Sequence, residues 1–221
     1  MKIKICGIKT LDEIKIINEF LPDYIGFIFA KSKREVDFKK ALELKQNLNK
    51  KIKAVGVFVD SKIENILNFY NEKIIDIAQL HGEYSEDEIE ELKNKGLDVI
   101  KVIKVKENFY NIKTKADFIL FDTYSPIQAG GLNKTFNWNI KINSNVPYFI
   151  AGGINEGNIL EMRKKLDPYG VDISSGVEEN GFKTKEKVSN IIKIVRGKNL
   201  WLKENMVNLG DNTFLKPWCM K

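Results

Sequence analysis

Two glycine-containing stretches, Ala151-Gly152-Gly153-Ile154 and Asp172-Ile173-Ser174-Ser175-Gly176, decide the fold that this sequence predicts. Each comes where a short apolar run ends, and a third such end lies near the start of the chain, at Ile5-Cys6-Gly7-Ile8. Because runs of this length are typical of buried strands, the glycines and the thiol fall at the carboxyl ends of strands. A (β/α)8 barrel carries its chemistry on that face and holds phosphate after its seventh and eighth strands. The three stretches therefore favour a catalytic barrel.

Short β-rich runs alternate with helical patterns along most of the chain. The runs predict strands over 2–8, 24–29, 54–59, 75–80, 99–105, 118–121, 147–151 and 171–174. Most are continuous in Val, Ile and Phe, which is typical of parallel strands buried on both faces. Eight such units predict an α/β protein, a (β/α)8 TIM barrel with about eight helices. An open doubly wound sheet is the alternative architecture.

The helices between the strands carry start and stop signals. Three capping boxes predict helix starts: Thr10 with Glu13, Ser61 with Glu64, and Ser85 with Glu88. Gly96 follows two lysines and predicts a helix end. The last helix carries apolar residues at helical spacing, namely Val188, Ile191, Ile192 and Val195.

We expect one catalytic barrel domain over residues 1–198, followed by a C-terminal extension over 199–221. The extension breaks the βα alternation and contains Trp201 and Trp218. Because two indole rings are costly to leave in water, packing against the barrel is favoured. A partner-binding segment and a frayed tail are the alternatives.

Composition excludes several classes of function. The 221 residues carry a net charge of +6, but the lysines are scattered, which favours small anionic ligands over nucleic acid. Two distant cysteines, Cys6 and Cys219, and a single histidine, His81, supply neither a disulfide framework nor the ligand spacing of a metal site. No apolar run approaches a membrane span, and the N-terminus lacks the apolar segment of a signal peptide. We therefore expect a cytoplasmic protein.

Two residues stand where acid–base chemistry would be placed. Cys6 closes the first strand, either as a small buried hydrophobe or as a reactive thiol. A free thiol of pKa ~8.5 is only about 3% thiolate at pH 7, so a catalytic role requires a lowered pKa or a very acidic C–H bond. Asp122 follows four apolar residues at the end of the sixth strand, as a cap or as a group delivered to a site. Thr123 can cap equally well, which leaves Asp122 free for chemistry.

The remaining candidates would bind a ligand. Six loop residues are suited to hold phosphate through their backbone: Gly130, Gly131, Gly152, Gly153, Ser175 and Gly176. Arg34 lies in the loop after the second strand, and its guanidinium suits a carboxylate unless it is an ordinary surface arginine. His81 closes the fourth strand, either as a second base or as a structural residue at the barrel rim.

Read together, these motifs resemble the phosphoribosylanthranilate isomerase family of tryptophan biosynthesis. The motifs are Lys4-Ile5-Cys6-Gly7-Ile8, Gly26-Phe27-Ile28-Phe29, Ser32-Lys33-Arg34, Val55-Gly56-Val57-Phe58, Gln79-Leu80-His81-Gly82, Asp122-Thr123, Gly130-Gly131, Phe136-Asn137-Trp138, Ala151-Gly152-Gly153-Ile154 and Val171-Asp172-Ile173-Ser174-Ser175-Gly176-Val177-Glu178. They run in order over about residues 2–197, and the Cys-Gly and Ser-Ser-Gly-Val-Glu blocks are the specific ones.

The resemblance implies a cofactor-free Amadori rearrangement of N-(5-phosphoribosyl)anthranilate to 1-(2-carboxyphenylamino)-1-deoxyribulose 5-phosphate. It implies Cys6 as general base and Asp122 as general acid, with no metal. Arg34 would hold the anthranilate carboxylate, His81 would contact substrate, and the backbone at the glycine loops would hold the phosphate. The implied partner is this small molecule, with neither nucleic acid nor membrane, and the expected assembly is a monomer or a homodimer.

Three alternatives remain open. The family pattern has a glycine at Asn133 and a proline at Lys33, and these departures fit a non-catalytic phosphosugar-binding protein. An isomerase of a histidine-pathway aminoimidazole substrate would use paired aspartates, against which Cys6 argues. The charge of +6 fits a basic nucleic-acid-binding module.

Overall fold

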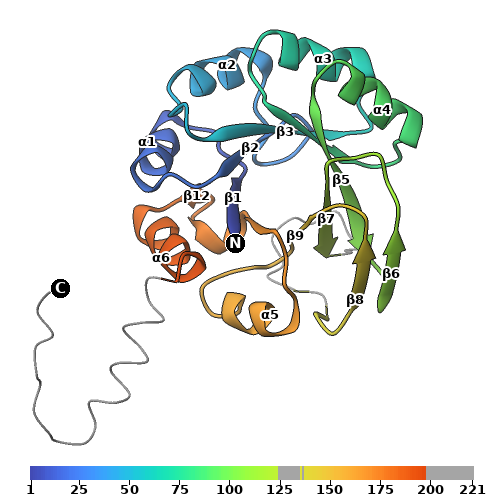
Figure 1. Ribbon diagram of the computed structural model, residues 1–221. Coiled ribbons are helices and arrows are strands. Elements are labelled where there is room, and N and C mark those ends of the chain that lie inside the picture. Colours follow the sequence, from blue (N-terminus) through green and yellow to red (C-terminus); the bar gives the residue numbers. More distant parts are fainter. Residues whose placement is uncertain (124–134, 136, 198–221) are drawn as a thin grey trace, which may run out of the picture.

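The strands close into a parallel barrel with helices around it. The structure, a computed structural model, describes residues 1–123, 135 and 137–197. Eight strands form the ring in the order β1-β10-β9-β7-β5-β4-β3-β2 (Figure 1). They are β1 (Lys2–Cys6), β2 (Tyr24–Ile28), β3 (Lys53–Val59), β4 (Ile77–His81), β5 (Asp98–Val105), β7 (Phe118–Thr123), β9 (Tyr148–Ile150) and β10 (Gly170–Ile173). These match the eight predicted strands, so the closed barrel is confirmed and the open sheet is wrong.

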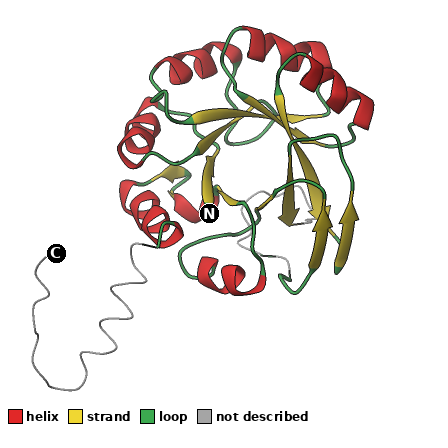
Figure 2. Ribbon diagram, viewed as in Figure 1, coloured by secondary structure: helices red, strands yellow, loops and turns green. Residues whose placement is uncertain are grey.

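Six α-helices cover the outside of the barrel within the described ranges (Figure 2). They are α1 (Leu11–Phe20), α2 (Phe38–Gln46), α3 (Ile63–Asn71), α4 (Glu86–Asn94), α5 (Ile159–Lys165) and α6 (Lys185–Val195). The four apolar residues predicted for the last helix are all buried on α6, and Gly96 follows α4 as expected. The outer core is therefore built from helix faces packed against the strands.

Within the described ranges, the helices number fewer than the eight or so that the sequence predicts. After β5 the chain forms β6 (Phe109–Ile112), which pairs in parallel with β8 (Lys141–Ser144) beyond β7. Both segments alternate between exposed and half-buried side chains, the period of a strand with one face in water. Tyr110 of β6 packs its ring 5.2 Å from that of Phe121, so this small sheet covers the barrel where a helix was expected (Figures 1 and 2).

Two of the three predicted capping boxes form. Thr10 with Glu13 caps α1, and Ser85 with Glu88 caps α4. The Ser61–Glu64 box is wrong, because α3 begins after Lys62 and has no side-chain cap. The backbone N–H and C=O of Ser61 instead bond the Tyr84 hydroxyl, at 2.7 and 3.1 Å. A contact from the neighbouring βα unit has therefore replaced the local cap.

The barrel interior toward the amino ends of the strands is apolar. Its side chains, called the apolar layer below, are Tyr24, Val55, Ile77, Ile100, Leu120, Phe149 and Ala151, all at most 8% exposed. The Tyr24 hydroxyl lies 3.2 Å from that of Tyr169, so the polar atom of this ring is paired. Because side chains alternate along a strand, the residues two and four positions later also face inward, nearer the carboxyl ends of the strands.

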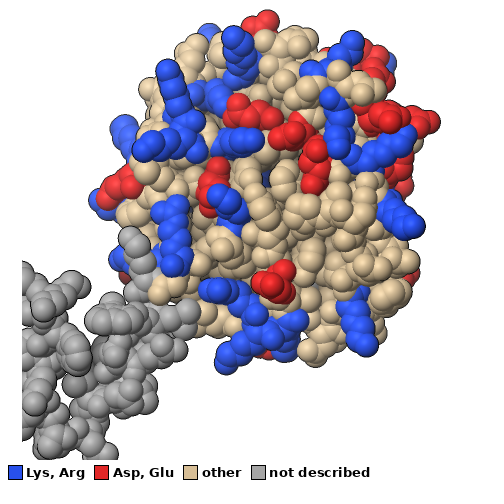
Figure 3. Space-filling model, viewed as in Figure 1, with Lys and Arg blue, Asp and Glu red and all other residues tan. Residues whose placement is uncertain are grey.

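The predicted extension, 199–221, lies outside the described residues, as do Gly130 and Gly131. Among the described residues, no helix is long and apolar enough to cross a membrane. On the face shown in Figure 3, basic and acidic side chains are mixed around the rim, and neither sign forms one continuous patch.

Candidate active site

Several inward-facing residues toward the carboxyl ends of the strands are polar. This polar layer consists of Lys4 and Cys6 of β1, Gln79 and His81 of β4, Asp122 of β7 and Asp172 of β10. Four of its members, Lys4, Cys6, Gln79 and Asp172, are less than 9% exposed. Among the described residues, Gln79 Oε1 and Asp172 Oδ1 find no hydrogen-bond partner. The interior thus carries charged and unpaired groups at the face where barrel enzymes hold substrate.

Cys6 ends β1 and is 7% exposed. Burial raises the pKa of its thiol, and Asp172 raises it further, while Lys4 and Lys183 lower it. The net effect is a raised pKa, so Cys6 rests as a thiol at neutral pH. Of the two conditions that the sequence analysis set for a catalytic Cys6, a lowered thiol pKa is therefore not met. A role as base then depends on the other condition, a very acidic substrate C–H bond.

Asp122 is the penultimate residue of β7 and lies across the barrel mouth from Cys6, with β9 and β10 between their strands on one side. Burial raises the pKa of Asp122 to about 6, and Asp172 raises it as well. A hydrogen bond from the Thr123 N–H, at 2.8 Å, and the charges of Lys104 and Lys4 oppose that rise. Asp122 is therefore suited to hold and release a proton near neutral pH.

His81 ends β4, beside the Gln79 amide. The Gln79 Nε2 lies 2.8 Å from His81 Nε2, so in this orientation the amide donates and the imidazole nitrogen accepts. Burial lowers the pKa of His81 to about 4, helped by Lys4 and Lys104. The ring is neutral at pH 7 and its accepting nitrogen is occupied, which favours the structural or substrate-contacting reading over a second base.

Arg34 reaches the site from the loop after β2 and is paired there. Its Nε and Nη2 donate to the two carboxylate oxygens of Glu178, at 2.7 and 2.6 Å. A Cβ built on Gly7 would lie 2.5 Å from Arg34 Cδ, so the side chain crosses the backbone immediately after Cys6. The ordinary surface arginine is excluded, and the carboxylate that Arg34 holds in this structure belongs to the protein.

Glu178 and Lys183 complete this group. They belong to a short hairpin, β11 (Glu178–Glu179) and β12 (Phe182–Lys183). Lys183 Nζ donates to Glu178 at 2.6 Å and to the Ser174 carbonyl at 3.0 Å, and its side chain is fully buried. Arg34 and Lys183 outweigh the effect of burial and lower the pKa of Glu178 to about 2. This group is a fixed ion network beside Cys6.

The two described glycine loops lie against each other. Gly152 follows β9, and a Cβ on it would lie 2.0 Å from Thr123 Oγ1. Gly176 belongs to a 3-10 turn, Ser175–Val177, and a Cβ there would lie 2.0 Å from the Ile154 carbonyl oxygen. Only glycine permits these approaches. Gly152, Gly153, Ser175 and Gly176 are therefore brought together at one end of the barrel, as the sequence predicts.

The sequence reading missed Lys4, Gln79, Asp172, Glu178 and Lys183. Lys4 and Gln79 stand two residues before the recognised residues Cys6 and His81 on the same strands, so strand periodicity could have found them. The network of Glu178 and Lys183 carries no such local signal, because Arg34, which donates to Glu178, is 144 residues from it along the chain. Among the described residues, no group of three or more His, Cys, Asp or Glu side chains could hold a metal ion.

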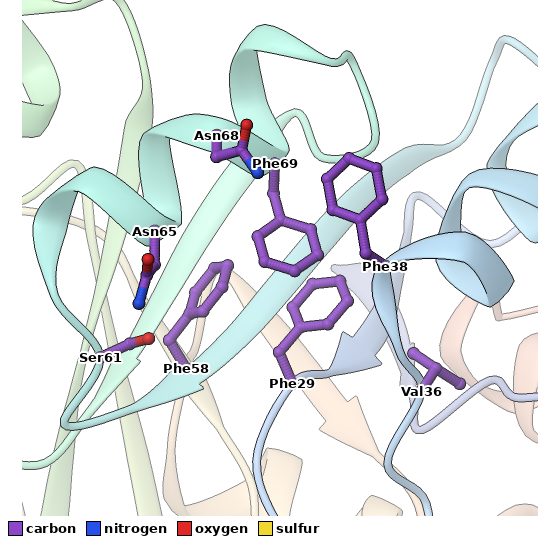
Figure 4. A pocket seen from close by; sticks show the side chains of 8 residues that line it. All are labelled: Phe29, Val36, Phe38, Phe58, Ser61, Asn65, Asn68 and Phe69. Carbon is purple, nitrogen blue, oxygen red and sulfur yellow. The ribbon is translucent and has the colours of Figure 1, made fainter.

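A cavity of about 330 Å³ lies elsewhere, between β2, β3, α2 and α3 (Figure 4). Four phenylalanines, Phe29, Phe38, Phe58 and Phe69, gather there, and the rings of Phe29 and Phe69 lie 4.1 Å apart. Its lining contains Phe, Val, Ser and Asn side chains only. With no acid or base in its walls, this cavity does not offer the proton transfers that the polar layer can perform.

Comparison with known proteins identifies one family. The sequence model of the N-(5'phosphoribosyl)anthranilate (PRA) isomerase family matches residues 3–194. The N-(5'-phosphoribosyl)anthranilate isomerase of Endomicrobium trichonymphae is 47% identical over 196 residues, covering 88% of this chain and 98% of that protein. The enzyme of the same name from Thermoanaerobacter pseudethanolicus is 43% identical, covering 89% and 98%.

Solved structures of similar fold carry the same name. The crystal structure of phosphoribosyl anthranilate isomerase from Thermotoga maritima has a TM-score of 0.76 and 28% identity, covering 89% of this chain and 99% of that one. A second isomerase structure, in complex with reduced 1-(o-carboxyphenylamino)-1-deoxyribulose 5-phosphate, has a TM-score of 0.73 and 26% identity, with the same coverage.

Proposed function

Because the chain belongs to the N-(5'-phosphoribosyl)anthranilate isomerase family, we propose that its polar layer converts phosphoribosylanthranilate to the carboxyphenylamino-deoxyribulose phosphate, a step of tryptophan biosynthesis. The observation that carries this proposal is the placement of Cys6 and Asp122 at the ends of β1 and β7, on opposite sides of one barrel mouth. A proton donor and a proton acceptor that act at different atoms of one sugar need this separation.

In the first step Asp122 acts as general acid. Its carboxyl gives a proton to the furanose ring oxygen while the bond from C1′ to that oxygen breaks. The anilino nitrogen supplies the electron pair that forms a C1′=N double bond, which leaves an open-chain iminium ion. The raised pKa of Asp122, about 6, keeps a protonated fraction available near neutral pH.

In the second step Cys6 acts as general base. Its thiolate takes the proton from C2′, and the electrons of that C–H bond form a C1′=C2′ double bond while the iminium electrons return to nitrogen. The enolamine then tautomerises to the ketose. Because the iminium makes the C2′ proton acidic, a small thiolate fraction suffices even though burial raises the pKa of Cys6.

The neighbouring residues bind the two anionic ends of the substrate. Arg34, oriented by both oxygens of Glu178, would present its remaining N–H groups to the anthranilate carboxylate. The backbone N–H groups near Gly153 and Gly176, with those of Gly130 and Gly131, would hold the phosphate. His81, neutral at pH 7, would contact substrate as a hydrogen-bonding group.

The test is loss of anthranilate fluorescence when the purified protein meets phosphoribosylanthranilate made in situ. We expect rapid loss with the wild type and with Cys219→Ser, which keeps Cys6. Cys6→Ser should slow the loss by on the order of 10²–10⁴. Absence of turnover by the wild type would reject the isomerase, while full activity of Cys6→Ser would reject the role of its thiol. Turnover of the aminoimidazole substrate alone would favour the histidine-pathway alternative.

A further inference from the structure

Lys4 is a charged side chain enclosed within the barrel. It is 0% exposed, and its Nζ donates to Asp172 Oδ2 at 2.8 Å. The two residues are direct neighbours in the register of β1 and β10. A buried ion pair is weak evidence for stability, since desolvation of both charges offsets their attraction. The pair therefore needs an explanation beyond its contribution to folding.

The ammonium of Lys4 lies beside the thiol of Cys6. The two residues are two positions apart on β1, so both side chains face the barrel interior. A Cβ placed on Gly26 of β2 would lie 2.6 Å from Cys6 Sγ and 3.2 Å from Lys4 Nζ. Both atoms therefore converge on one point of the neighbouring strand, where the absence of a side chain leaves room for them.

The other charges around Cys6 are differently engaged. Asp172 of β10 faces it and is paired with Lys4, while Lys183 of β12 and Arg34 both donate to Glu178. Asp172 Oδ1 has no partner among the described residues. Lys4 is thus the cation of this group that lies on the same strand and the same face as the thiol.

We propose that Lys4 is a positioning residue for Cys6. The buried ammonium of Lys4, anchored by Asp172, stabilises the Cys6 thiolate that removes the C2′ proton. This inference rests on the proposed function of Cys6 as general base. The titration behaviour agrees with it, since Lys4 has the largest lowering effect on the pKa of Cys6, ahead of Lys183, while burial and Asp172 act in the opposite direction.

The experiment measures the thiol directly. In a Cys219→Ser background, the rate of alkylation of Cys6 by iodoacetamide is followed against pH by mass spectrometry, which gives the pH midpoint of thiolate formation. Lys4→Met alone leaves Asp172 buried without a partner. Lys4→Met/Asp172→Asn removes both charges at nearly constant volume. The matched control is Lys15→Met/Asp12→Asn, which deletes an exposed ion pair on α1.

We expect the midpoint to rise by about one pH unit in Lys4→Met/Asp172→Asn, so that alkylation at pH 7 slows about tenfold. Lys4→Met should raise it further, because Asp172 then acts unopposed, and the control should match the wild type. A folded double variant, verified by circular dichroism, with the wild-type midpoint would overturn the inference. Turnover of the wild type is measured alongside. A midpoint shifted in the double variant, with a wild type that shows no isomerase activity, would reject the proposed function and leave the charge effect established.

Discussion

The apolar layer and the polar layer occupy the same barrel and follow the same alternation of side chains, yet they differ in what they stabilise. In the apolar layer every side chain is hydrophobic or, as in Tyr24, has its polar atom paired. In the polar layer Lys4 and Asp172 are buried ions, and Gln79 Oε1 lacks a partner among the described residues. Unpaired buried polar groups cost stability. The difference agrees with the proposal that the apolar layer maintains the fold and the polar layer performs the chemistry.

The largest expected effect is on catalysis by Asp122→Asn. The amide can accept the Thr123 N–H bond that the carboxyl accepts, but it cannot supply the proton that opens the furanose ring. We expect kcat to fall on the order of 10²–10⁴-fold in the fluorescence assay. Asp12→Asn, on the exposed surface of α1, should leave kcat unchanged. A kcat within about threefold of wild type would remove the general-acid role from Asp122.

Leu120→Ala probes the apolar layer on the same strand, two residues before Asp122. Leu120 is 1% exposed and packs within the barrel interior. Its truncation should lower the free energy of unfolding by about 3 kcal/mol, through lost burial and the cavity left behind. Urea unfolding measures this effect. The value of kcat/KM at 25 °C should stay close to wild type, and a large loss of turnover in the folded variant would show that the two layers are not separable.

Arg34→Lys tests the ion network at the rim. A lysine retains the charge but cannot bond both oxygens of Glu178 and also face a carboxylate. We expect KM to rise about tenfold to a hundredfold with little change in kcat, because substrate binding and not proton transfer is altered. Lys31→Ala, an exposed lysine of the same loop, serves as the control. An unchanged KM would show that the anthranilate carboxylate of the substrate does not bind to Arg34.

The pH dependence of kcat/KM sharpens the assignment of the two groups. The proposed mechanism needs Asp122 protonated and Cys6 deprotonated, whereas their pKa values, about 6 and raised from 9.0, favour the reverse. The product of the protonated fraction of Asp122 and the thiolate fraction of Cys6 is then constant between the two pKa values. We therefore expect kcat/KM to fall below about pH 6 and again in the alkaline range. His81, with a pKa of about 4, should contribute no limb near pH 6.5. In Asp122→Asn the plateau should disappear, and the residual kcat/KM should rise with pH as Cys6 ionises. A plateau that persists in this variant would contradict the assignment.

The barrel could be predicted because its strands are buried on both faces and read as continuous apolar runs. The sheet of β6 and β8 was missed because only one face of each strand is covered, and the short alternation in Phe109–Ile112 is a weaker signal than a long apolar run. The failed cap at Ser61 has a different cause. Its local pattern was correct, but the Tyr84 hydroxyl, from the next βα unit, competes for the same backbone.

The site residues that lie at or just after the end of a strand could be predicted from the sequence. Cys6, His81 and Asp122 were found because each closes a strand, and the glycines because each follows one. The Arg34–Glu178–Lys183 network was not found, because it joins the loop after β2 to a hairpin beyond β10. A single sequence carries no signal for such a contact, and the charged side chains involved read locally as surface residues.

The most direct test of the division between the two layers is the stability of Asp122→Asn. Because the folded-state pKa of Asp122, about 6, lies above its ordinary value of 3.8, its charged form destabilises the fold, and stability is lost as pH rises through 6. Urea unfolding at pH 8 should therefore show the variant more stable than wild type by on the order of 2 kcal/mol, with the gain fading by about pH 4. A variant that is equally or less stable than wild type at pH 8 would contradict the claim that the polar layer sacrifices stability for chemistry.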